Sequence, residues 1–141
     1  MQAINFEEAL EQILAADRRF HRQAYFFLRE ALDHTQKTIG KPDPDVVHHV
    51  TGQELLEGIR QHALKEFGPM AMTVFCEWGV HRCEDWGEIV FNMIAHNLLA
   101  KTKQDSRDDF RGGYDFYTAF RGPFLPARKT LELLPEPKPQ P

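Results

Sequence analysis

A chain of 141 residues has the size of a single ordinary domain, and its 42% hydrophobic and 27% charged residues exclude a disordered polymer and a bundle of membrane helices. The net charge of −4 disfavours a polyanion as the main partner. Two cysteines are too few for a disulfide scaffold, and the first residues lack the basic and apolar regions of a signal peptide. The sequence therefore predicts a cytoplasmic protein without a membrane span.

The first two predicted helices occupy residues 5–17 and 20–39. Asn5 and Glu8 have the spacing of a capping box, in which each side chain satisfies a backbone N–H at the helix start. Apolar residues then recur at helical spacing in both segments, which indicates one buried stripe on each helix. Gly40 is suited to the left-handed position after a helix, so we expect the second helix to end there.

The third and fourth predicted helices occupy residues 51–67 and 69–78. Thr51 and Glu54 form a second capping box at the start of the third helix. Pro69 suits the first position of a helix, where its missing N–H is not needed. The fourth helix is apolar almost all round, so we expect it to be short and buried.

A fifth helix is predicted over residues 85–99, opened by a capping box of Asp85 and Glu88. Residues 101–111 are strongly charged and fit either a short helix capped by a serine or a hairpin. Residues 115–121 fit one or two further helical turns.

These elements predict an all-α fold of five to seven helices in one domain over residues 1–126. Residues 127–141 are rich in proline and have little to bury, which predicts a flexible tail. The predicted core comprises Leu10, Ile13, Leu14, Phe27, Leu28, Leu32, Leu56, Ile59, Phe67, Val74, Ile89, Val90 and Met93.

Six aromatic residues occur within residues 110–124. Soluble monomers rarely expose an apolar surface as large as these side chains would form. We expect this segment to close, like a clasp, over the groove between the first two helices and the last three. The alternative is that it docks onto a partner. Candidate binding residues are then Tyr114, Tyr117 and Phe120.

Cys76, His81 and Cys83 form a weak candidate zinc site, because thiolates and imidazole are good zinc ligands. A fourth ligand would come from His96, Glu84 or Asp85. The spacing matches no common zinc module, and the alternative is a buried Cys76 in the fourth helix with an inert Cys83 in a loop. We therefore expect neither a metal nor another cofactor.

Arg18, Arg19 and Arg22 cluster where the second helix begins. Basic side chains beside helix N–H groups bind phosphate or an acidic protein segment. The same arginines could instead form ion pairs with the glutamates of the first helix.

Four segments of the chain resemble a small uncharacterised bacterial family restricted to planctomycetes and verrucomicrobia. These segments are Phe6–Leu14, Ala24–Leu32, Gly52–Arg60 and Gly87–Asn92. The resemblance covers residues 4–126 and implies a bacterial, cytosolic, single-domain protein. It implies no activity, ligand or site.

Three functions compete. Aromatic richness and the lack of a recognisable catalytic motif favour a non-enzymatic module that binds a protein partner. The alternative is a winged-helix-like nucleic-acid or ribosome-associated protein, with residues 85–99 as recognition helix and residues 98–110 as wing. The acidic start of that helix disfavours phosphate contacts. An enzyme using Cys76 and histidines comes third, because the single serine, Ser106, fits a helix cap and His48 and His49 fit a solvated loop.

Overall fold

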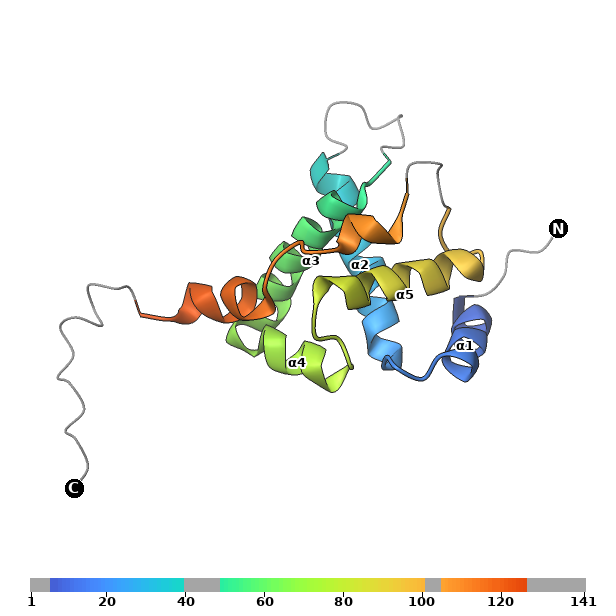
Figure 1. Cartoon of the computed structure of the whole chain (residues 1–141), viewed down its shortest axis with the longest axis horizontal. Helices are drawn as coiled ribbons and strands as arrows, with labels where there is room; N and C mark the ends of the chain where they lie inside the picture. Colours follow the sequence, from blue (N-terminus) through green and yellow to red (C-terminus); the bar gives the residue numbers. More distant parts are fainter. Residues whose placement is uncertain (1–5, 40–48, 101–104, 127–141) are drawn as a thin grey trace, which may run out of the picture.

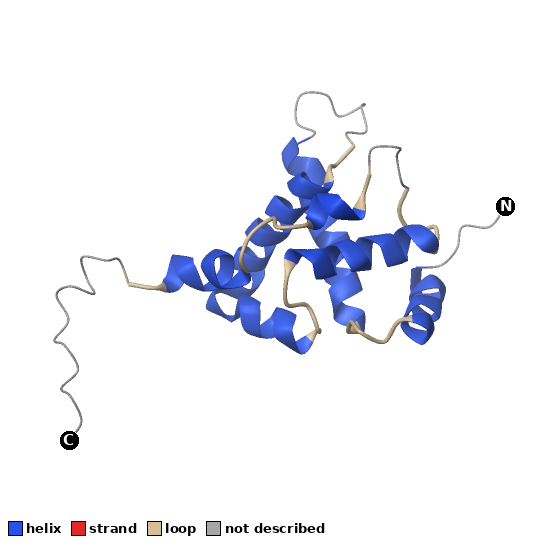
Figure 2. Cartoon of the chain, in the orientation of Figure 1, coloured by secondary structure: helices blue, strands red, loops and turns tan. Residues whose placement is uncertain are grey.

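The computed structural model describes residues 6–39, 49–100 and 105–126, and within these ranges the chain forms helices and no strand (Figure 2). The all-α prediction is thus confirmed. The predicted tail, the Asn5 capping box and the Gly40 helix end lie outside the described residues. The helices are α1 (Phe6–Ala16), α2 (Arg22–Ile39), α3 (Gly52–Phe67), α4 (Ala71–Glu77) and α5 (Cys83–Ala95). A short turn, η1 (Gly68–Met70), lies between α3 and α4, and three more follow α5: η2 (Arg107–Phe110), η3 (Tyr117–Arg121) and η4 (Gly122–Phe124).

The two longest helices, α2 and α3, run antiparallel and side by side (Figure 1). Their close approach depends on Gly58, because a Cβ atom there would clash with the side chain of Thr35 on α2. α5 lies across α2, while α1 packs beside α2, and α4 lies under α3. No helix in the described ranges has the length and apolarity needed to cross a bilayer.

The start of α3 confirms the predicted capping box. The Thr51 hydroxyl accepts a hydrogen bond from the Glu54 N–H at 3.1 Å, and the Thr51 N–H donates to the Glu54 carboxylate at 3.0 Å. The capping box predicted at Asp85 is wrong, because α5 begins earlier, at Cys83. Asp85 lies inside the first turn, and its carboxylate accepts the His81 N–H at 2.9 Å.

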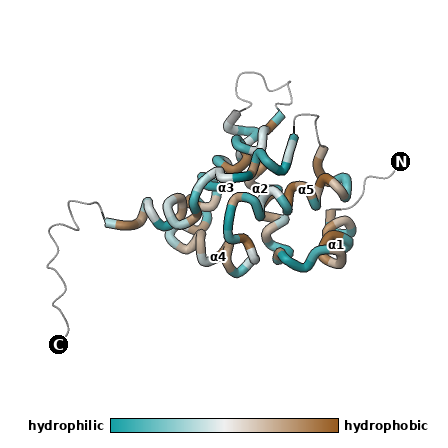
Figure 3. Tube along the Cα trace, in the orientation of Figure 1, coloured by the Kyte–Doolittle hydropathy of each residue, from teal (hydrophilic) through white to brown (hydrophobic). Residues whose placement is uncertain are grey.

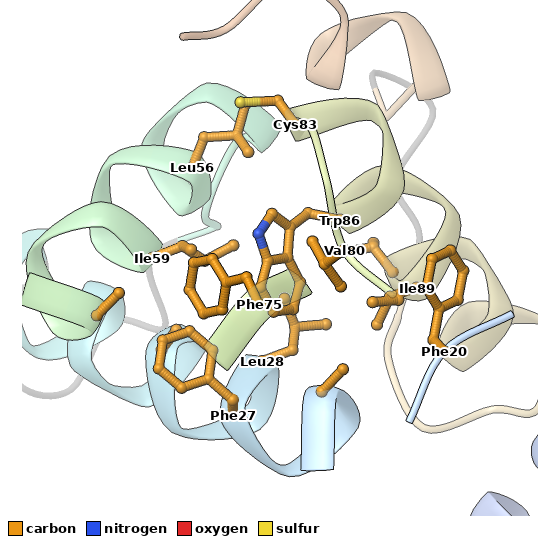
Figure 4. Close-up of a cluster of buried hydrophobic side chains, with 14 of the residues drawn as sticks. Phe20, Phe27, Leu28, Leu56, Ile59, Phe75, Val80, Cys83, Trp86 and Ile89 are labelled. Carbon is orange, nitrogen blue, oxygen red and sulfur yellow. The ribbon is translucent and has the colours of Figure 1, made fainter. Parts of the chain in front are cut away.

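The centre of the core is Phe75 on α4, a residue absent from the predicted core (Figure 4). Its ring lies 5.1 Å from Trp86, 5.3 Å from Phe27 and 5.1 Å from Phe120, measured between ring centroids. These partners come from α5, α2 and η3, so one side chain joins three elements that lie far apart in the sequence. Val74, predicted in its place, is only partly buried.

Most of the predicted core is confirmed, since the remaining predicted residues on the five helices are buried or pack partly against the core. Leu14, Leu32 and Phe67 are in the second group. The expectation that α4 is buried all round is wrong. Met70 before it is 55% exposed, and Cys76 faces solvent, because α4 is covered only on the Phe75 side.

Residues 110–124 dock onto their own chain, as the clasp hypothesis expects. Phe110 fits against Gly52 on α3 and Gly87 on α5, where a Cβ atom at either glycine would meet the Phe110 side chain. The Tyr114 hydroxyl donates to the Leu56 carbonyl oxygen at 2.7 Å. The position differs in part from the prediction, because the segment packs mainly on α3, α4 and α5.

The hydrophilic linker between α1 and α2 (Figure 3) is held to α5 by a polar network. The Asp17 carboxylate accepts hydrogen bonds from the Arg19 guanidinium, the shortest at 2.6 Å. It also accepts one from the Asn92 side-chain amide at 3.0 Å. The Arg19 guanidinium also reaches Glu88 at 3.4 Å. Asn92 donates to the buried Tyr25 hydroxyl at 3.1 Å, which links the network to the core.

The hydrogen bonds from Arg19 hold the pKa of the Asp17 carboxyl well below its usual range, so this group should make stability depend on pH. A carboxyl whose pKa is lowered by folding stabilises the fold above its unfolded pKa of about 4. That stabilisation is lost as the pH falls toward the folded pKa. We expect Asp17→Asn to lower the free energy of unfolding by about 1–2 kcal/mol at neutral pH and by much less near pH 3. The effect is modest because Arg19 is 56% exposed and water screens the pair.

Urea unfolding at both pH values measures this difference. Asp33→Asn is the matched control, since Asp33 pairs with Lys37 on the open surface of α2. Parallel pH dependence of wild type and Asp17→Asn would show that the network does not couple stability to pH.

Candidate functional site

A pocket opens where four segments meet: the second half of α2, the start of α3, the end of α5 and residues 105–110. Its volume is about 250 Å³. The floor is apolar and includes Leu32, Leu55, Val90, Ile94 and Leu99. These side chains belong to the stripes that build the core, so the pocket is a place where the core reaches solvent.

The rim of the pocket is polar and includes His49, Asp105 and Asp109. The Asp105 carboxylate accepts a hydrogen bond from Nε2 of His49, at a distance of 3.0 Å. The Asp109 carboxylate accepts the Ser106 N–H at 3.0 Å as part of a capping box at η2. This box confirms the predicted role of Ser106 as a cap. His49 is an exposed loop residue, as predicted, and it also bonds to Asp105 at the pocket.

The rim brings together a serine, a histidine and an aspartate, the residue types of a hydrolase triad. In such a triad the histidine bonds the serine hydroxyl through its second ring nitrogen. Here the Ser106 hydroxyl accepts the Asp108 N–H at 3.2 Å, which fixes it as a helix cap. The arrangement therefore holds a turn in place and does not present an activated nucleophile.

The residues of the candidate zinc site are not brought together. Among the described residues, no group of three or more His, Cys, Asp or Glu side chains is placed to hold a metal ion. The expected environments of the two thiols are reversed, since Cys76 is exposed and Cys83 is buried. Burial raises the pKa of the Cys83 thiol to about 11, and the thiol donates to the Tyr114 carbonyl oxygen at 3.4 Å. A thiol in this state is a poor source of the thiolate that binds zinc.

The three candidate arginines are divided among different contacts. Arg19 belongs to the Asp17 network, and Arg22 pairs with Glu11 on α1. Arg18 is exposed in the linker. Arg22 therefore follows the ion-pair alternative, whereas Arg19 pairs with Asp17 in the linker and Glu88 on α5, neither of which is a glutamate of the first helix.

The three candidate aromatic residues also differ in their surroundings. Phe120 is fully buried against Phe75, so it forms part of the core and offers no surface to a partner. Tyr114 is partly buried, and burial raises the pKa of its hydroxyl well above the usual range. Tyr117 alone of the three is largely exposed, at 54%.

The pocket itself was not predicted from the sequence, because Asp105 and Asp109 occur in a charged stretch that resembles an ordinary solvated surface. One local signal was present, since Ser106 followed by Asp109 has capping-box spacing. Nothing in the sequence indicates that this turn packs against the start of α3 and the first half of α5.

Comparison with known proteins identifies no relative of this chain, so the resemblance to the bacterial family stays a prediction. No family model matches the chain, and neither the curated proteins nor the solved structures give a match.

Proposed function

We propose that this chain is a protein-interaction module whose partner inserts a side chain into the pocket between α2, α3, α5 and residues 105–110. The supporting observation is the apolar floor, which is open to solvent at a place where the surrounding rim is polar. A buried apolar anchor ringed by polar groups is the usual anatomy of a protein interface.

The size of the pocket favours a partner's side chain over a cofactor as its occupant. Sites for small molecules generally enclose about 300–1,000 Å³ and bury most of the ligand. A pocket of about 250 Å³ lies below that range, and its floor is made of aliphatic side chains. One large apolar side chain suits this space.

A photoreactive amino acid at Gln36 tests the proposal, because Gln36 lines the pocket and is exposed. We expect illumination in the native cell to give a crosslinked protein product. Leu99→Glu places a charge on the floor and should abolish the product. Leu125→Glu is the matched control, since Leu125 is 49% exposed in the segment after η4 and is not one of the residues that line the pocket. A product that survives Leu99→Glu would contradict the proposal.

A winged-helix-like nucleic-acid or ribosome-associated protein is the alternative. Its support is the succession of α3, α4 and α5, with Phe75 of α4 packed on Trp86 of α5. Against it, the first turn of α5 contains Glu84 and Asp85 and the helix has no Lys or Arg, so this turn would repel phosphates. A crosslinked product that disappears on nuclease treatment would favour this alternative.

A further inference from the structure

An apolar patch lies on the surface of η1, η3 and η4. It contains every large hydrophobic side chain that is exposed among the described residues, namely Met70, Tyr117, Phe124 and Leu125. η1 contacts η3, and η3 contacts η4, so these elements gather at one end of the molecule (Figure 1). None of the four residues lines the pocket, so the patch is a second surface, separate from the proposed partner site.

We infer that residues 131–137 of the same chain dock on this apolar patch. Soluble proteins rarely leave an apolar patch uncovered. The sequence continues beyond Pro126 with residues 127–141, which lie outside the described residues, so this segment starts directly beside the patch. Leu131 follows Leu125 by six residues, a reach of about 20 Å when the chain is extended.

The tether favours this segment over any separate molecule. A segment joined to its binding surface by a short connection has an effective concentration in the millimolar range. A second copy of the chain or a foreign protein must instead lose its translational and rotational freedom on binding. A contact that is too weak to hold a separate partner can therefore hold residues 131–137.

The sequence of the segment provides an apolar edge. Residues 135–141 have proline at every second position, which favours a polyproline II helix with three residues per turn. Leu131, Leu134 and Pro137 are spaced by three residues, so they would share one edge of such a helix. Leu133 would point in another direction. The composition of the tail alone predicts flexibility, because it shows nothing against which these leucines could be buried.

The patch offers the surface that such an edge requires. Tyr117 and Phe124 supply two aromatic rings, 54% and 47% exposed. Polyproline II segments dock on aromatic surfaces, because their backbone is already extended and loses little entropy on binding. The flexible thioether side chain of Met70 adapts to an irregular partner.

A photoreactive phenylalanine analogue in place of Tyr117 tests the inference in the full chain, since the exposed ring can be replaced without disturbing the core. We expect illumination to crosslink the analogue to residues 131–137 of the same molecule, as mapped by mass spectrometry. Leu134→Ser should lower the yield of this product about three- to tenfold. Leu133→Ser is the matched control and should leave the yield unchanged, because it changes the neighbouring leucine outside the apolar edge.

Nuclear magnetic resonance of the methionine methyl groups gives a second measurement without a photoreactive group. In the full chain, Leu134→Ser should change the methyl signal of Met70, because docking on the patch is lost. The signal of Met93 should stay the same, since Met93 is buried in the core. A Met70 signal that does not respond to Leu134→Ser would overturn the inference.

Three crosslinking results would also overturn it. A product that joins two chains and grows with protein concentration would mean that a second copy covers the patch. Equal yields in Leu134→Ser and Leu133→Ser would exclude the apolar edge. An equal yield from the analogue at Lys37, exposed on α2, would mean that the segment touches the surface at random. None of these results bears on the pocket, because the patch and the pocket share no residue.

Discussion

A chain that ends at Arg111 is expected to unfold or aggregate, whereas a chain that ends at Pro126 should keep its thermal midpoint within about 2 °C. The shorter chain loses Phe116 and Phe120, both buried, and uncovers Phe75 at the centre of the core. Loss of a single buried aromatic side chain costs about 3–5 kcal/mol, against a total stability of about 5–15 kcal/mol. The longer chain keeps all of these contacts.

Thermal unfolding and size-exclusion chromatography of the two truncated chains measure this effect. A milder variant, Phe120→Ala, avoids the loss of a whole segment and should lower the urea midpoint without abolishing folding. A monomeric chain ending at Arg111 with wild-type stability would mean that residues 112–126 are not part of the folded core.

Gly79→Ala is expected to cost about 2–5 kcal/mol, for two separate reasons. The backbone at Gly79 has a φ of 82°, a conformation that residues with a Cβ atom rarely adopt. An added Cβ would also clash with the Arg19 carbonyl oxygen in the linker between α1 and α2. This contact cannot open cheaply, because the His21 N–H donates to the Trp78 carbonyl oxygen at 3.0 Å and ties the same two segments together.

Gly68→Ala separates the two reasons. Gly68 has a φ of 52°, but an added Cβ would meet no atom within 4 Å. It should therefore show only the backbone cost of about 1–3 kcal/mol. Equal urea midpoints for the two variants would mean that the linker moves away from Gly79 without loss of stability.

The helices could be predicted from the sequence because their signals are local. The capping box at Thr51 and the apolar stripes of α1, α2, α3 and α5 each depend on residues a few positions apart. Phe75 could not be found in this way. Residues 70–78 are apolar on nearly every side, so periodicity does not distinguish the face that meets α2 and α5 from the face that meets water.

The pocket could not be predicted because it is formed by tertiary contacts alone. Its rim depends on His49 and Asp105, which lie far apart in the sequence and meet at 3.0 Å. Asp85 shows that sequence spacing can also mislead over a few residues. Its spacing from Glu88 fits a cap, but Asp85 bonds the His81 N–H, because α5 begins two residues earlier.

The central position of Phe75 has a consequence for the order of events during protein synthesis. A ribosome makes α1 to α5 before it makes Phe116 and Phe120, so a nascent chain holds the aromatic face of α4 without its last two aromatic partners. Apolar surface exposed at that stage is what chaperones bind and what drives aggregation. The core can close only after residues 110–124 have left the ribosome, so the final folding step follows the synthesis of this segment.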